Sequence, residues 1–388
     1  MRVADPFLFL CGSRRAIERI ASDRRAWVTG ALLVLSAGVA RNYDHLDLRS
    51  DPEWFVGPFA ASLVSILFIF ACLAGPLRLV RQGPLGPQLL TFLTLAWLTA
   101  PCAWLYGLPV EAMTDIVTAT RWNIAFLAIV SVWRVALMTR AVSLLAGVRW
   151  QRALPLVLAP AALEAMLGSW WKGMSLVQIM GGVRLPPHEQ ILQNAAHIAA
   201  TLSFWIFLAS IVAAFATRGV ATARLDRPRR RSSVLPAVAA LAALAIGLVL
   251  SIPHQARVGN QRWLEVLVRD GRYDDAAAFA SERTRADFPP THALPPGARR
   301  FPPELLGALA PDAPDWLRRT WHRDALESLT THGSLSAERV REFERYHPGI
   351  RRLLREHADG LRSRPPERLS FLESRWLERF DEIDAPAP

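Results

Sequence analysis

Residues 54–77 read WFVGPFAASLVSILFIFACLAGPL and carry no charged side chain. A helix needs about 20 apolar residues to cross the roughly 30 Å hydrocarbon core of a bilayer at about 1.5 Å per residue. This stretch meets that length, so it predicts a membrane-spanning helix. We therefore expect an integral membrane protein.

Six more apolar stretches repeat the pattern and predict an all-α, polytopic transmembrane helix bundle. The expected spans are approximately 26–40, 54–77, 85–106, 122–139, 153–171, 191–217 and 234–252. The first is short, and its small-residue end, Gly38-Val39-Ala40, also fits the cleavage site of a signal peptide. We favour an uncleaved span because 25 residues with six arginines precede it. Cleavage would leave six spans.

The net charge of +11 does not indicate nucleic-acid binding, because the charge is unevenly distributed. Residues 254–388 contain 22 Arg and 22 acidic residues, so the whole excess lies in residues 1–253, the apolar part. We therefore expect no nucleic acid partner. The basic residues are 44 Arg and a single Lys, Lys172, which indicates a high-GC bacterial genome.

The basic residues also predict an orientation, because short cytoplasmic loops are enriched in Lys and Arg. Alternate segments, namely 1–25, 78–84, 140–152 and 218–231, contain 17 basic residues. The segments between them, 41–53, 111–121 and 172–190, contain 5. We expect a multi-pass protein of the bacterial cytoplasmic (inner) membrane, with a cytoplasmic N-terminus and an extracytoplasmic C-terminal domain.

The chain changes character after residue 253, so we expect a transmembrane domain over 1–253 and a soluble, all-helical domain over 254–388. Helices are expected at about 258–270, 273–286, 302–309, 314–329, 336–346, 348–359 and 366–382. Several begin at prolines, which lose no helical hydrogen bond in the first turn. The segment 286–303 contains six prolines and is expected to be an extended strap.

Residues 262–283 resemble the turn of a tetratricopeptide-type helical hairpin. Gly271, Tyr273 and Ala276 stand where that motif places a turn glycine, an aromatic and a small residue. The Trp-x2-Leu-Gly spacing of the motif is not met, and no second copy follows. The resemblance implies a surface for binding protein, and a plain helical hairpin is the alternative. The candidate partner-binding residues are Trp263, Gly271, Tyr273 and Phe279.

Arg134 and Glu164 are ionisable residues inside the fourth and fifth expected spans. Such groups cost about 2.5–3.5 kcal/mol on insertion scales, so they raise a functional question. At 1.5 Å per residue, Arg134 lies about 9 Å and Glu164 about 18 Å from the same membrane interface. An ion pair between these neighbouring spans is therefore feasible. The alternative is structural: Arg134 reaches the interface while Glu164 is protonated or bonded to a neighbouring helix. We favour the structural role.

Ala239, Ala243 and Gly247 form a small-residue stripe on the last span. Such stripes let helix backbones approach closely, so this one predicts a packing face within the bundle or between protomers of an oligomer.

We find no catalytic, metal or cofactor motif, and we lean against an enzyme. His188-Glu189 lacks the second histidine of a zinc helix, and His322-Arg323-Asp324 lacks the rest of a kinase catalytic loop. The sequence favours a non-enzymatic scaffold or assembly factor that presents its C-terminal domain to a protein partner. The alternative is a small-molecule transporter or flippase-like protein that uses Arg134 and Glu164. Its spans would be broken at Pro58, Pro101, Pro155 and Pro160.

Overall fold

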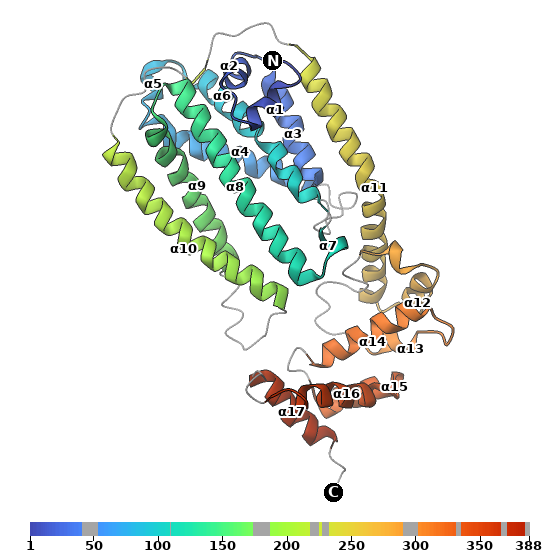
Figure 1. Ribbon diagram of the computed structural model, residues 1–388. Coiled ribbons are helices and arrows are strands. Elements are labelled where there is room, and N and C mark those ends of the chain that lie inside the picture. Colours follow the sequence, from blue (N-terminus) through green and yellow to red (C-terminus); the bar gives the residue numbers. More distant parts are fainter. Residues whose placement is uncertain are drawn as a thin grey trace. The chain divides into compact units, whose positions relative to one another are not determined.

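The computed structural model describes residues 1–40, 53–108, 110–173, 187–217, 225–226, 233–289, 302–330, 335–365 and 371–384. The chain divides between Gln255 and Ala256 into two compact units, which we call the membrane unit and the C-terminal unit (Figure 1). Throughout these described residues the regular structure is helical, which confirms the expected fold class.

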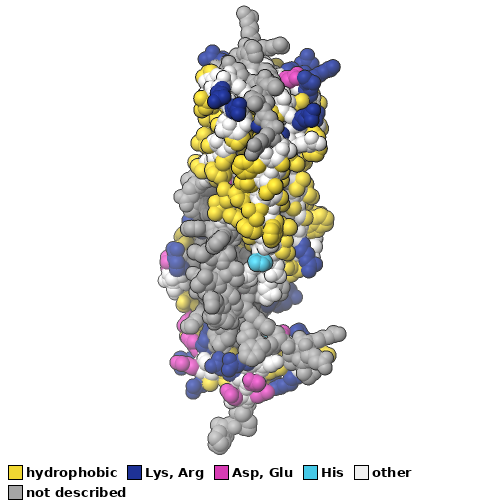
Figure 2. All heavy atoms as spheres, turned by 90° about the vertical axis from the view of Figure 1, so that its left-hand side faces the viewer, with side chains coloured by type: hydrophobic (Ala, Val, Ile, Leu, Met, Phe, Trp, Pro, Cys, Tyr) yellow, Lys and Arg dark blue, Asp and Glu magenta, His cyan; other side chains and the backbone are white. Residues whose placement is uncertain are grey.

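Among the described residues, six helices are long and apolar enough to cross a membrane, so this is a multi-pass membrane protein. They are α4 (Glu53–Ala74), α6 (Leu85–Trp97) with η2 (Ala100–Gly107), α8 (Ile116–Ala146), α9 (Trp150–Gly173), α10 (Pro187–Ala216) and α11 (Leu235–Arg269). Figure 2 shows a broad apolar surface over the membrane unit, with arginine side chains gathered at its upper end.

The first expected span, 26–40, is the helix α3 (Ala26–Ala40), which has 15 residues and is shorter than the six spans above. It is largely enclosed by its neighbours α4, α6 and η2, and Leu33, Val34 and Ala37 belong to the core of the membrane unit. A Cβ atom on Gly30 would lie 2.9 Å from the Cβ of Trp97, so glycine permits the close approach of α3 and α6.

The fourth span is longer than its apolar sequence suggested, because capping residues extend it at both ends. The side chain of Asp115 accepts hydrogen bonds from the backbone N–H groups of Val117 and Thr118, and so begins α8. Gly147 ends it in a left-handed conformation with φ of 65°. The helix therefore runs over 31 residues instead of the expected 122–139.

The prolines affect the spans unequally. At Pro101 the third span changes from α-helix to the 3-10 helix η2, as expected of a residue that cannot donate a backbone hydrogen bond. In contrast, α4 continues through Pro58, and α9 continues through Pro155 and Pro160. The expectation of broken helices at these three prolines is therefore wrong.

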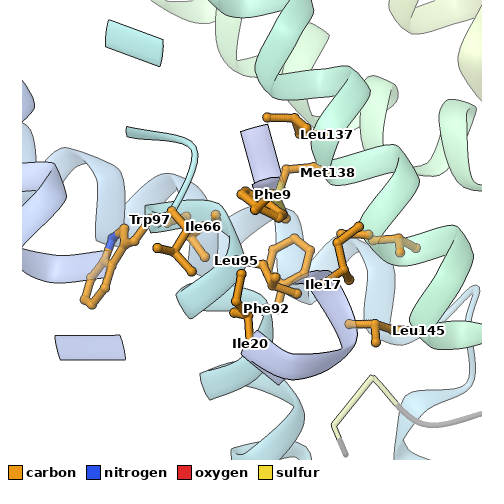
Figure 3. Close-up of a cluster of buried hydrophobic side chains, with 14 of the residues drawn as sticks. Phe9, Ile17, Ile20, Ile66, Phe92, Leu95, Trp97, Leu137, Met138 and Leu145 are labelled. Atoms are coloured by element: carbon orange, nitrogen blue, oxygen red, sulfur yellow. The ribbon is translucent and has the colours of Figure 1, made fainter. Parts of the chain in front are cut away.

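The first 25 residues contain two helices, α1 (Asp5–Leu10) and α2 (Arg14–Ala21), which were not predicted from this arginine-rich sequence. We call this pair the N-terminal cap. Phe9, Ile17 and Ile20 are almost fully buried, and Figure 3 shows them within one apolar cluster of the membrane unit. The other labelled members are Ile66, Phe92, Leu95, Trp97, Leu137, Met138 and Leu145.

Two further helices of the membrane unit are single turns, α5 (Leu79–Gln82) and α7 (Val110–Met113). The last span, α11, extends without interruption through Pro253 to Arg269. The prediction of a span at 234–252 and a separate soluble helix at 258–270 is therefore wrong, because the two form one helix of 35 residues.

The C-terminal unit has a core of its own, around the buried side chains of Leu264, Trp321, Phe343, Leu354 and Phe380. Its remaining elements lie close to the expected ranges. They are α12 (Tyr273–Ser281), η4 (Arg285–Asp287), α13 (Glu304–Gly307), α14 (Asp315–Thr330), α15 (Ala337–Tyr346), α16 (Ile350–Arg362) and α17 (Phe371–Asp384). Most of the expected proline-rich strap, residues 290–301, lies outside the described residues.

Candidate functional site

Arg134 extends from α8 to the point where the third span breaks. Its Nε donates a hydrogen bond to the hydroxyl of Thr99 over 3.0 Å. Thr99 is fully buried between α6 and η2, and its hydroxyl in turn donates to the carbonyl of Ala96 over 2.6 Å. The C-terminal end of a helix favours a positive charge because its last carbonyl groups lack helical donors. Arg134 therefore stabilises the helix break that Pro101 imposes.

Two other residues of α8 attach the N-terminal cap to the bundle. The indole Nε1 of Trp133 donates to the carbonyl of Leu10 over 3.0 Å. The guanidinium Nε of Arg140, about two turns further along the helix, donates to the carbonyl of Gly12. Arg134 is thus one of several polar side chains by which α8 holds neighbouring segments.

Glu164 lies on α9 and is half-buried. Its Oε2 accepts a hydrogen bond from the hydroxyl of Ser65 on α4 over 2.6 Å. A polar group inside the bilayer is costly unless a neighbouring helix supplies a partner, and interhelical hydrogen bonds of this type hold transmembrane helices together. This hydrogen bond therefore links α9 to α4.

The two intramembrane charges have hydrogen-bond partners on different elements. Arg134 connects α8 to the break after α6, whereas Glu164 connects α9 to α4. Both charged residues were recognised in the sequence, but their hydrogen-bond partners, Thr99 and Ser65, were not. A single hydroxyl in an apolar stretch carries no pattern, although Thr99 stands two residues before the helix-breaking Pro101. The pairing of Arg134 with Glu164 stays a prediction.

The segment predicted as a hairpin consists of the end of α11, a turn at Gly271 and the helix α12. Gly271 has a φ of 73°, in the left-handed region that favours glycine. The N–H of Arg272 donates to the carbonyl of Leu267, and the N–H of Gly271 donates to that of Val268. These two bonds are the Schellman pattern, which satisfies the last carbonyls of a helix.

The aromatic residues of this hairpin differ in exposure. Tyr273 and Phe279 are partly buried and pack against the core of the C-terminal unit. The Arg283 guanidinium carbon lies 3.5 Å from the centre of the Phe279 ring, as in a cation–π contact. Trp263, in contrast, is 49% exposed. Of the four predicted residues, only Trp263 presents a large apolar side chain that a partner can reach.

The small-residue stripe of α11 lies partly against the bundle. A Cβ atom on Gly247 would lie 3.6 Å from a methyl carbon of Val39 in α3. Ala243 is partly buried, and Ala239 is exposed. Gly247 thus faces an intrachain neighbour, while the use of this stripe between protomers stays a prediction.

A pocket of about 20 Å³, which has room for one water molecule, lies between α2 and α6. Its lining includes Ile20, Asp23, Arg24, Leu90, Thr94 and Asp226, and neither Arg134 nor Glu164 belongs to it. Among the described residues, no group of three or more His, Cys, Asp or Glu side chains is placed to hold a metal ion.

A comparison with known protein families, with curated proteins and with solved structures finds no match for this chain.

Proposed function

We propose that this protein is a non-enzymatic membrane scaffold or assembly factor whose C-terminal unit binds a protein partner. Trp263 carries the proposal. It is 49% exposed, whereas Trp321 and Trp376 of the same unit are buried. Tryptophan is enriched among the residues that dominate binding energy at protein interfaces, because a partner can desolvate a large rigid ring at small entropic cost.

The helix α11 supports the anchoring part of this proposal. Residues 235–252 form its strongly apolar part, and Trp263 lies eleven residues beyond in the same unbroken helix. At 1.5 Å per residue the 35 residues extend over about 52 Å, which exceeds the thickness of a bilayer core. The helix thus supplies both a membrane anchor and part of the binding face.

The intramembrane charges favour this proposal over transport. Arg134 and Glu164 each have a hydrogen-bond partner that fixes the packing of neighbouring helices, Thr99 and Ser65 respectively. In this proposal both charges stabilise the bundle and neither binds a substrate.

A photo-crosslinking amino acid at position 263 of the full-length chain tests the proposed binding face. We expect one discrete adduct with a protein that mass spectrometry identifies. The matched control places the same amino acid at Arg319, which is exposed on α14, and should give no such adduct. Equal labelling from both positions, or no protein adduct from 263, would contradict the proposal.

We further propose that the chain lies in a bacterial cytoplasmic membrane with its C-terminal unit outside the cytoplasm. The asymmetry of basic residues supports this orientation. Reporter fusions after residues 84, 152 and 231 should give cytoplasmic signals, and a fusion after 388 an extracytoplasmic one. A cytoplasmic signal at all four positions would refute the orientation.

A further inference from the structure

The N-terminal cap has one apolar face inside the bundle and a second that is exposed. Phe9 of α1 is fully buried, but Val3, Phe7 and Leu8 are 44%, 58% and 42% exposed. Phe7 and Leu8 lie on α1 itself, and Val3 stands in the turn directly before it. Large apolar side chains clustered on a surface indicate that something apolar covers them.

The exposed face of α1 continues the lipid-facing surface of α8. Trp133 bonds the carbonyl of Leu10 at the end of α1, which brings the two helices together. On α8, Trp133 is 40% exposed, its neighbour Val132 is 71% exposed, and Ile129, one turn before, is 50% exposed. Apolar side chains exposed on a membrane-spanning helix contact lipid. The apolar side chains of α1 adjoin this surface.

The charge of the same end of the bundle is strongly positive. The exposed arginines of the cap and of the neighbouring turns are Arg2, Arg14, Arg15, Arg24, Arg25, Arg78, Arg81, Arg140 and Arg149. Acidic groups in the cap are already engaged: Asp5 is buried against Arg19, Glu18 pairs with Arg14, and Asp23 pairs with the amino group of Met1. Figure 2 shows arginine side chains gathered at this end, beside the apolar surface.

We propose that the N-terminal cap is an interfacial anchor that binds anionic phospholipid. Val3, Phe7 and Leu8 enter the upper acyl region, and the exposed arginines contact the phosphate groups. Amphipathic helices with basic and bulky apolar side chains lie in the interface in this way, and anionic headgroups attract the basic residues. Continuity with the lipid-facing side of α8, together with the positive charge, favours lipid as the occupant over a second protein.

The depth of the cap in a bilayer tests the first part of this proposal. Cys11 directly follows α1 and is exposed, so a fluorophore attached there reports on the end of α1. The full-length chain with Cys72→Ala is labelled and reconstituted in vesicles of phosphatidylcholine, with or without 30% phosphatidylglycerol. We expect nitroxide lipids labelled near the headgroup to quench the fluorophore, and aqueous iodide to quench it only weakly.

The variant Phe7→Ser/Leu8→Ser should lose most of the lipid quenching and become open to iodide. Both side chains lie outside the buried core, so the variant is expected to fold, which its elution volume in detergent checks. Val132→Ser on α8 is the matched control and should leave the fluorophore where it was. Free access of iodide in the unsubstituted chain would overturn the proposal, as would protection that appears only when other proteins are added.

The arginines test the choice of lipid. About 1 kcal/mol per basic residue near an anionic surface corresponds to about a fivefold change in lipid preference. Arg15→Gln/Arg25→Gln should therefore lower the preference for phosphatidylglycerol over phosphatidylcholine severalfold, as counted by native mass spectrometry of bound lipids. An unchanged ratio, or equal retention of both lipids by the unsubstituted chain, would overturn the anionic selectivity.

Discussion

Phe7 and Phe9 offer a matched test of whether the N-terminal cap belongs to the folded core. They are the same residue type in the same short helix, two positions apart. Phe9 is fully buried, whereas Phe7 is 58% exposed. Replacing a buried phenylalanine by alanine costs about 3–5 kcal/mol, because transfer free energy is lost and a cavity remains. Surface substitutions usually change stability by less than about 0.5 kcal/mol.

Phe9→Ala should therefore lower the free energy of unfolding of the membrane unit by about 3–5 kcal/mol, and Phe7→Ala should leave it nearly unchanged. Both variants would be measured in detergent, where no bilayer acts on the exposed face, by thermal unfolding followed through elution of the intact protein. Equal stability of the two variants would refute the assignment of Phe9 to the core.

Three further outcomes are expected. Ser65→Ala should destabilise the bundle by about 1 kcal/mol, typical of an interhelical hydrogen bond in a membrane. Glu164→Gln keeps an acceptor for the Ser65 hydroxyl and should leave the stability unchanged. Normal folding of Glu164→Gln with complete loss of function would contradict the structural role of Glu164. Gly271→Ala should cost about 1–2 kcal/mol in unfolding of the C-terminal unit, since its φ of 73° is unfavourable for a side chain; a neutral result would mean that the turn rearranges. The hydrogen bond and charge of Arg355 hold the pKa of Asp384 below its usual value. The ion pair therefore stabilises the docking of α17 fully above the ordinary carboxyl pKa, and this stabilisation is lost as pH falls through the lowered pKa. Limited proteolysis of α17 should accelerate in acid, and Asp384→Asn should remove that pH dependence.

The spans were predictable from sequence because a bilayer imposes a length of apolar residues that needs no knowledge of partners. The break at Pro101 agrees with the local effect of a missing N–H. The same local effect did not decide the other spans, because α4 and α9 continue through their prolines. The helices of the C-terminal unit were recognisable for a related reason. The hydroxyl of Ser336, for example, caps α15 by accepting a hydrogen bond from the N–H of Arg339.

The N-terminal cap was missed because its arginines obscured its apolar pattern. Ala16, Ile17, Ile20 and Ala21 lie on one face of α2 at the spacing of an amphipathic helix. The six arginines before residue 26 suggested an exposed segment. Local composition indicates which side chains water can solvate, but it does not show that a distant apolar surface is available to cover the others.

The partners of the intramembrane charges were also beyond the sequence. Ser65 and Glu164 are 99 residues apart, and their contact depends on how α4 and α9 pack. The continuity of α11 is a comparable case. Pro253 removes one helical hydrogen bond, yet the helix persists where His254 and Val258 are buried beside it. Tertiary contacts outweigh a local helix-breaking preference there.

The N-terminal cap can dock only after a later part of the chain, α8, has been synthesised. Leu10 is held by Trp133, which lies 123 residues later. At about 5–20 residues per second the ribosome needs about 6–25 s to make that interval. Until the fourth span emerges, the first helices of the chain have no complete binding surface, and their arginines remain available to set the side on which the chain begins. The beginning of the protein is therefore made first and docks only after the later spans are in place.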